Sequence, residues 1–459
     1  MITGQHKTPP IPVMLAWLWL GCLTLFGGTA QARDFHNVIL EVIAIPIGAF
    51  LLWRNPSLFH PRGIMIFMYA VVAVAISQIV PLPYSLWAMM PGHDIYADAL
   101  KQAAIIPRAR PWSLTPDLTL ASLTGLIPLV VTVVTMRAMD AKQRRQLIIP
   151  VFVIVFLGAI LGNAQMAQGA DSPLRLYRLS TADGPVGFFS NRNHHALSLA
   201  MAIPLAVVVL QVTRSRDKSW LTPWLTLGVA ALFALAVVIA GSRGALLIAI
   251  PGLAFLILPF RSLIQRGVLK RRGWGLGAVA VLVIAAFGLV ALILTNSGRA
   301  LSLTRLLHTA TTDELRWRSL GPIWHIASAY FPFGSGFGSF DTVFRAAEPM
   351  SLLKPTYLNQ AHNEPLQVLL EAGVPGIAIV VIMLIVIGRL ALGVIAAKEG
   401  RRTFGFLGLM ILVQLGLTSL ADYPLRTPLL ASLALVACFW LADASAHDEG
   451  AVASPSRIS

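Results

Sequence analysis

Charged residues are scarce in this chain of 459 residues. Asp, Glu, Lys and Arg make up 12% of it, whereas a soluble globular domain carries about 25%. The shortage excludes an ordinary soluble domain, and a hydrophobic content of 56% points to a lipid bilayer as the surrounding solvent. The regular alternation of a membrane β-barrel is also lacking. The composition therefore predicts an all-α polytopic membrane protein.

Cysteines and metal-binding motifs are also few. The two cysteines, Cys22 and Cys438, lie inside apolar runs, which is typical of small core residues. The sequence has no HExxH motif, paired cysteines or acidic cluster, and no GxSxG motif. We therefore predict no metal and no cofactor. The segment "GSGFGSF" (334–340) lacks the βαβ context of a nucleotide loop, and we interpret it as a flexible turn near a sugar or phosphate.

Long hydrophobic runs are abundant and predict about twelve transmembrane helices. They are expected at residues 13–28, 38–53, 63–81, 120–136, 147–162, 194–212, 221–240, 244–260, 274–294, 365–388, 403–420 and 427–442. The first run, followed by "TAQA", also resembles a signal peptide, and cleavage of residues 1–32 would leave eleven spans.

Basic residues orient these spans. With the N-terminus inside, the short inner loops hold 18 Lys and Arg in 54 residues, and the outer segments hold 15 in 157. This is the positive-inside pattern, so the basic charge sets orientation and does not predict a nucleic-acid partner.

The orientation also predicts the organisation of the chain. We expect a membrane region at 1–294 with outer loops at 82–119 and 163–193, and a large periplasmic loop at 295–364 before the tenth span. The last spans follow at 365–444, and a disordered tail at 445–459. A loop as long as 295–364 is usually functional.

Two arginines stand at predicted outer helix ends. Arg192 lies in "FFSNRNHHA", where Asn191 or Asn193 can cap the following helix. Arg243 lies in "GSRGA", a tight turn between two apolar helices. A helix N-terminus with an arginine favours an anion. The alternative is an interfacial arginine that extends to the membrane surface.

A histidine stands where the tenth span begins. In "AHNEPLQVLL", Asn363 can cap a helix that starts near Pro365, and His362 precedes the cap. A histidine there can act as a general base, with Glu364 and Glu371 either orienting it or favouring the helix N-terminus. A structural histidine is the alternative.

Further polar residues on the outer side complete the candidates. Asp422 and Arg426 flank a tight turn in "ADYPLRTP", where we expect an ion pair that closes the turn. Arg316 and Arg318 lie in the long outer loop and are possible supporting residues.

These motifs together resemble the superfamily of O-antigen ligases and of O-antigen and exopolysaccharide polymerases. The segments that carry the resemblance are "FFSNRNHHA", "GSRGA", "FPFGSGFGSF" and "AHNEPLQVLLEAGVPG", in that order, within about 110–430. The resemblance implies a metal-independent, inverting glycosyltransferase of the bacterial inner membrane with a periplasmic active face. The donor would be a glycan on undecaprenyl-pyrophosphate.

The resemblance also implies roles for three residues. Arg192 and Arg243 would bind the donor pyrophosphate, and His362 would be the catalytic base. The acceptor would be lipid A–core in a ligase of lipopolysaccharide assembly, or a second lipid-linked glycan in a polymerase, and the sequence does not separate the two. A polysaccharide transporter is the other class, although transporters place charges at the membrane midplane and contain related halves.

Overall fold

The computed structural model of the protein describes residues 10–31, 33–182, 184–213, 222–256, 311–353 and 358–446. Within these ranges the regular secondary structure is helical apart from one short antiparallel pair of strands, β1 (Pro81–Pro83) and β2 (Ala109–Pro111). Eight helical segments are long and apolar enough to cross a membrane, and three shorter helices are also apolar. The protein is therefore a multi-pass helical membrane protein, to which the structure adds a small sheet.

These apolar helices lie at eleven of the twelve predicted spans. They are α1 (Ile11–Phe26), α2 (Phe35–Arg54), α3 (Ile64–Ile79), α6 with α7 (Pro116–Thr124 and Ile127–Arg137), α8 with α9 (Ala141–Gln146 and Ile148–Gln168), α10 (Arg192–Thr213), α11 (Thr222–Ala240), α12 (Arg243–Ala254), α18 (Glu364–Ile395), α19 (Glu399–Ser419) and α20 (Pro428–Ser445). The predicted span at 274–294 lies outside the described residues, as does most of the predicted tail. The total of twelve stays a prediction.

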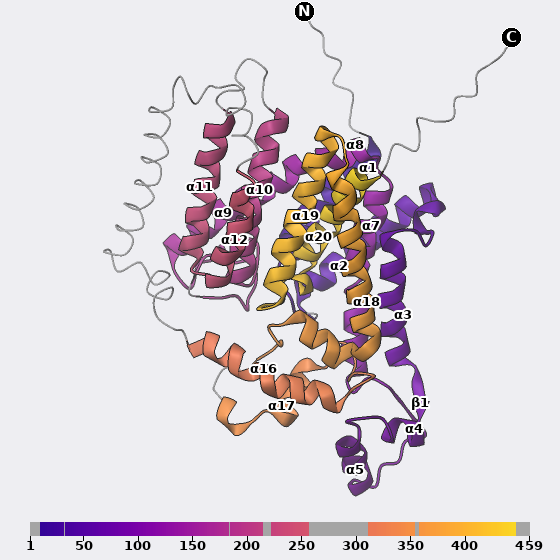
Figure 1. Cartoon of the computed structure of the whole chain (residues 1–459). Coiled ribbons are helices and arrows are strands. Elements are labelled where there is room, and N and C mark those ends of the chain that lie inside the picture. Colours follow the sequence, from indigo (N-terminus) through magenta and orange to yellow (C-terminus); the bar gives the residue numbers. More distant parts are fainter. Residues whose placement is uncertain are drawn as a thin grey trace, which may run out of the picture.

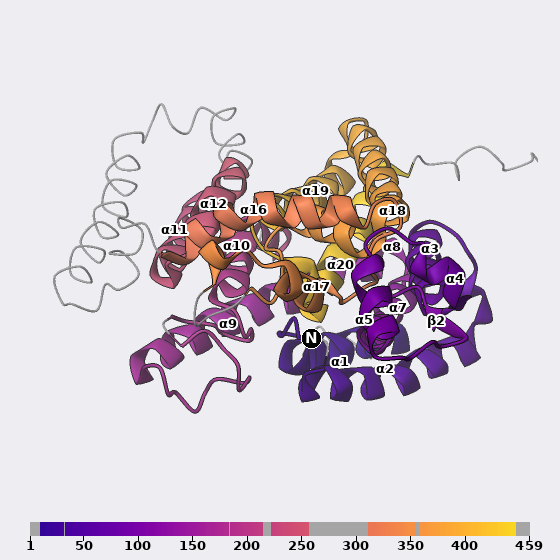
Figure 2. The same cartoon turned by 90° about the horizontal axis from the view of Figure 1, so that it is seen from below.

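The long helices stand side by side, and other helices lie across one end of the bundle, which we call the site end (Figure 1). α16 (Thr311–Ala329) and α17 (Phe340–Ala347) cross this end, and α16 packs against α18. Figure 2, seen from below, shows α16 running over the bundle from the α11–α12 side toward α18. α4 (Tyr84–Ala88) and α5 (Asp94–Gln102) extend from the same end. The predicted long loop 295–364 thus contains helices that cover the bundle.

α10 is the central helix of the bundle. Its residues 194–208 are all buried, and it packs against α9, α11, α12 and α19. The alanines of α10 let neighbouring helices approach closely. Pro204 cannot donate to the carbonyl of Ala200, and the side-chain amide of Gln414 on α19 donates to that oxygen instead, at 3.2 Å. The same amide donates to the carbonyl of Ile248 at 3.0 Å and so joins α10, α12 and α19.

Candidate active site

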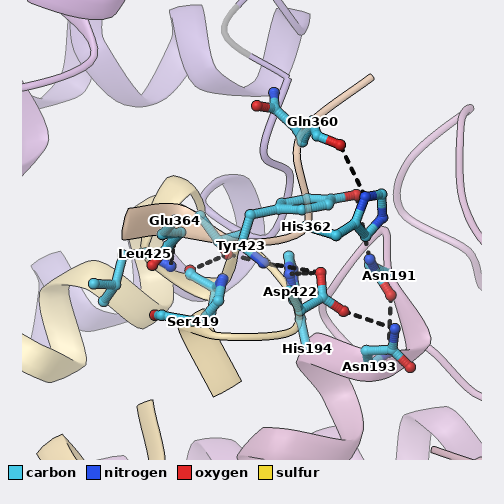
Figure 3. A network of polar contacts seen from close by, with 12 residues as sticks. Asn191, Asn193, His194, Gln360, His362, Glu364, Ser419, Asp422, Tyr423 and Leu425 are labelled. Atoms are coloured by element: carbon cyan, nitrogen blue, oxygen red, sulfur yellow. Dashed lines mark hydrogen bonds and ion pairs between the residues drawn. The ribbon is translucent and has the colours of Figure 1, made fainter. Parts of the chain in front are cut away.

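A polar cluster forms at the site end from segments that are far apart in the sequence. The N-terminus of α10 supplies Asn191, Asn193 and His194, and the segment before α18 supplies Gln360 and His362. The turn between α19 and α20, with the short helix η4 (Pro424–Arg426), supplies Asp422 and Tyr423 (Figure 3). Each segment is held at a helix end, so long apolar helices fix the positions of all these side chains.

His362 is held in a specific orientation and tautomer. Its backbone has φ of 51°, an uncommon value for a residue with a side chain, which points to a functional constraint. Its Nδ1 lies 2.9 Å from the backbone carbonyl oxygen of Gln360. Because a carbonyl oxygen only accepts, we assign the proton to Nδ1, so that Nε2 of the neutral ring carries the lone pair. The ring packs edge-on against Tyr423, with 4.9 Å between centroids.

The surroundings of His362 favour its neutral form. Burial lowers its pKa to about 4, and the charge of Arg316 adds to this effect, while Asp422 opposes it. At neutral pH the ring is therefore uncharged and able to accept a proton at Nε2. Asn363 caps α18 as predicted, since its side-chain oxygen accepts from the backbone N–H of Leu366 at 2.9 Å.

Asp422 is the buried anion at the centre of the cluster. Its carboxylate accepts from the Asn193 amide at 2.7 Å, and lies 3.7 Å from the Arg316 guanidinium and 3.8 Å from Nε2 of His194. Burial alone would raise the pKa of Asp422, but Arg316 and His194 lower it well below its usual range. The carboxylate therefore stays charged and draws α10, α16 and the α19–α20 turn together.

Tyr423 separates the two histidines of the cluster. Its ring lies edge-on to His362 and to His194, with 5.2 Å between the centroids of the second pair. Burial, with Asp422 nearby, raises the pKa of Tyr423 to about 12, so its hydroxyl stays protonated. The Asn191 amide donates to that hydroxyl at 3.4 Å.

Arg192 and Arg243 both begin helices at the site end. Asn191 caps α10 by accepting from the backbone N–H of Asn193 at 2.8 Å, which confirms one of the two predicted caps. Ser242 caps α12 by accepting from the N–H of Ala245. The two helices run in the same direction and pack together, so their N-terminal dipoles act at one end. Arg192 and Arg243 therefore each stand at a helix N-terminus, and the two helices are neighbours.

The expected ion pair between Asp422 and Arg426 is wrong. Arg426 instead pairs with Glu371 on α18, at 2.9 Å, and Glu371 also accepts from Gln367. The reason is the direction of the turn, which points Asp422 toward α10 and Arg426 toward α18.

The two glutamates considered as partners of His362 have other partners. Glu364 accepts from the backbone N–H of Leu425 at 2.8 Å, and Glu371 pairs with Arg426. The backbone of Gln360 holds the histidine ring instead. Of the two arginines on α16, Arg316 faces Asp422, while the exposed Arg318 donates to the carbonyl of Ser351 at 3.4 Å.

The glycine-rich segment 334–340 is a turn, as predicted, but a packed one. Ser335 and Gly336 donate backbone hydrogen bonds to the carbonyls of Leu370 and Glu371, and Phe337 donates to the Gln78 side chain. A side chain at Gly336 would collide with Ser113, so glycine is needed there for the close approach of the two segments.

Three residues of the cluster escaped prediction from sequence: His194, Gln360 and Tyr423. His194 carries no motif that distinguishes it from a core histidine, and Gln360 acts through its backbone carbonyl, which any residue could supply. Only Tyr423, next to Asp422 in a Pro-flanked turn, carried a usable signal.

Comparison with known proteins supports the resemblance. A search of curated proteins gave no match. Residues 228–381 match a family model described as O-antigen ligase (Wzy_C). The match begins in α11 and ends in α18, and it includes Arg243, Arg316 and His362 but neither Arg192 nor Asp422. Over residues 228–381, this multi-pass membrane protein is thus similar to the O-antigen ligase family.

Proposed function

We propose that the protein is an inverting glycosyltransferase that moves a glycan from undecaprenyl-pyrophosphate to an acceptor hydroxyl. The observation that carries the proposal is His362, a neutral histidine with its Nε2 lone pair left available by the Nδ1 contact to Gln360. It stands in a cluster with Arg316 and at the same end of the bundle as the two arginine-bearing helix N-termini. The family match is consistent with this chemistry.

The reaction needs one base and one anion site. His362 Nε2 would take the proton of the acceptor hydroxyl as its oxygen forms a bond to the anomeric carbon of the donor sugar. The bond from that carbon to the diphosphate oxygen breaks at the same time, and the electron pair leaves with the diphosphate. Arg192 and Arg243 would balance the charge that develops there, because a guanidinium matches phosphate oxygens in a bidentate manner.

Two further residues would support the base. Asp422 would hold His194 and Asn193 in place and stabilise the imidazolium that forms on His362. Arg316 keeps His362 neutral before the donor binds, and it adds positive charge beside the diphosphate.

We place the protein in the bacterial inner membrane with the site end in the periplasm. The support is the basic inner loops, which assign the helix ends of the cluster to the outer side. Lipid A–core is the acceptor we propose first. A second lipid-linked repeat unit, which would make the protein a polymerase, is the alternative, and the test offers both acceptors. Transport is less supported because the polar cluster lies at one end of the bundle, not at its middle.

The test compares His362→Gln, His362→Ala and the unchanged protein, purified in detergent with a defined lipid-linked donor and each acceptor. We expect both variants to bind donor normally and to transfer about 10²–10⁴-fold more slowly, which is the usual contribution of a general base. Glutamine can form hydrogen bonds but cannot accept the proton at neutral pH. An active Gln variant would remove the base role, and no transfer to either acceptor by the unchanged protein would remove the proposed function.

A further inference from the structure

A second polar site lies on the other side of the α19–α20 turn. A partly open cavity of about 280 Å³ is bordered by α2, α3, the junction of α6 and α7, and η4. Its apolar lining includes Ala75 and Phe337, and its polar lining includes Asn37, Glu41 and Arg426. The volume lies just below the usual range of small-molecule sites, about 300–1,000 Å³, which is enough for a single small ring.

Two buried polar atoms of this cavity lack hydrogen-bond partners among the described residues. They are Oδ1 of Asn37 and Nε of Arg426. Asn37 is only 7% exposed, and its amide nitrogen is already used, since it donates to the carbonyl of Gln31 at 2.7 Å. An unpaired buried polar atom costs free energy, so polar groups on a ligand in this cavity would be favoured beside Asn37 and Arg426.

The cavity also contains an acidic residue at membrane depth. Glu41 lies about two turns inside α2. In the described part of the chain, Glu371 is the other acidic residue this far inside an apolar helix, and Arg426 neutralises it. Glu41 has a hydrogen bond to the Thr124 side chain but no ion pair within the same residues. A carboxylate in such a place marks a functional site by default, and it repels a phosphate.

We propose that this cavity binds one hydroxyl-bearing sugar ring of a glycan substrate. The inference rests on the proposed function. The oxygens of Asn37 and Glu41 accept hydrogen bonds and the guanidinium of Arg426 donates them, and a sugar hydroxyl can serve both kinds of group. Phe337 offers an apolar surface to the ring. The turn places the ring beside the reaction, because Asp422 faces His362 while Arg426, four residues later, lines the cavity.

The ring can belong to the donor or to the acceptor, and kinetics separate them. Ala75→Leu fills the cavity, and Ala73→Leu is the matched control, since Ala73 is exposed on the same helix and does not line it. Glu41→Gln is nearly isosteric and serves if the filled variant fails to fold. We expect Ala75→Leu and Glu41→Gln to raise KM about tenfold for one substrate, with kcat and the other KM nearly unchanged. The substrate whose KM rises is the one that enters the cavity.

A direct binding measurement separates this inference from the proposed function. The probe is the soluble oligosaccharide released by mild acid from the host's own surface polysaccharide, and saturation-transfer NMR measures its binding to the full chain. Binding that is lost in Ala75→Leu and kept in Ala73→Leu supports the cavity even if the protein transfers no glycan. The inference is overturned if the unchanged protein transfers glycan and both cavity variants keep both KM values within about twofold. It is also overturned if the unchanged protein does not bind the probe.

Discussion

The acid limb of the pH profile tests the environment of His362 most directly. The perturbation is Arg316→Gln, which removes a positive charge that lowers the pKa of His362. In the unchanged protein, burial first and Arg316 second hold that pKa at about 4, against 6.5 for the free side chain. For a general base, kcat/KM falls as pH drops through the pKa in the free enzyme.

The magnitude follows from the two pKa values. At pH 5.5, a histidine with its usual pKa of about 6.5 would be roughly one-tenth neutral, whereas a pKa of about 4 leaves nearly all of it neutral. The unchanged protein should therefore keep almost its full kcat/KM at pH 5.5 and lose it toward pH 4. Arg316→Gln should move this limb to a higher pH, but not beyond pH 6.5, because burial of the ring still lowers the pKa of His362.

The assay is the initial rate of glycan transfer at limiting donor from pH 4 to pH 8. Arg316→Lys is the matched control, since it keeps the charge and should keep the limb in place. The donor diphosphate is esterified at both ends and therefore does not titrate between pH 4 and pH 8. The profile of kcat should show a limb at higher pH than that of kcat/KM, because bound diphosphate stabilises the imidazolium. An acid limb near 6.5 in the unchanged protein, or equal limbs for the Gln and Lys variants, would refute the reasoning.

Three further predictions test the anion site, the helix packing and the orientation. Arg243→Lys should raise KM for the donor about tenfold or more, because an ammonium lacks the bidentate fork, while Arg345→Lys on the exposed face of α17 should not; equal KM values would contradict the anion site. Gln414→Leu should lower the free energy of unfolding by about 1–2 kcal/mol, the scale of two interhelical hydrogen bonds in a membrane, seen as a lower melting temperature in detergent with KM unchanged. A stable variant would show that these bonds contribute little. In a cysteine-free background, Arg62→Cys should react with a membrane-impermeant thiol reagent only after the cells are opened. Met350→Cys should already react in intact cells whose outer membrane is permeabilised. The reverse pattern of labelling would reject the proposed orientation.

The sequence predicted the helices because membrane spans are local features. A run of apolar residues must hydrogen-bond its own backbone in lipid, so length and hydropathy alone place a helix. The described helices lie at eleven predicted positions for this reason. Helix caps are equally local, and Asn191 and Asn363 were found from their distance to the next apolar run.

The sequence did not predict which side chains from different helices contact one another. The sequence placed Asp422 and Arg426 in one turn and suggested an ion pair, but packing sends them to α10 and α18. His194 lies near Asp422 only because tertiary packing brings the two segments together. Gln360 is close to His362 in the sequence, but it acts through its backbone carbonyl, which the identity of its side chain does not predict. The helices of 311–347 were hidden because their mixed polarity resembles that of a loop.

By itself, then, the sequence determined the membrane class of this protein, the places of its helices and the three residues proposed to carry the chemistry. Tertiary structure alone decided which carboxylate faces which cation, which charges surround His362, and where a cavity remains between α2, α3 and the α19–α20 turn. The physical reason is range. Hydrophobicity and capping act within one or two helical turns, whereas burial and ion pairing depend on side chains up to hundreds of residues away in the chain.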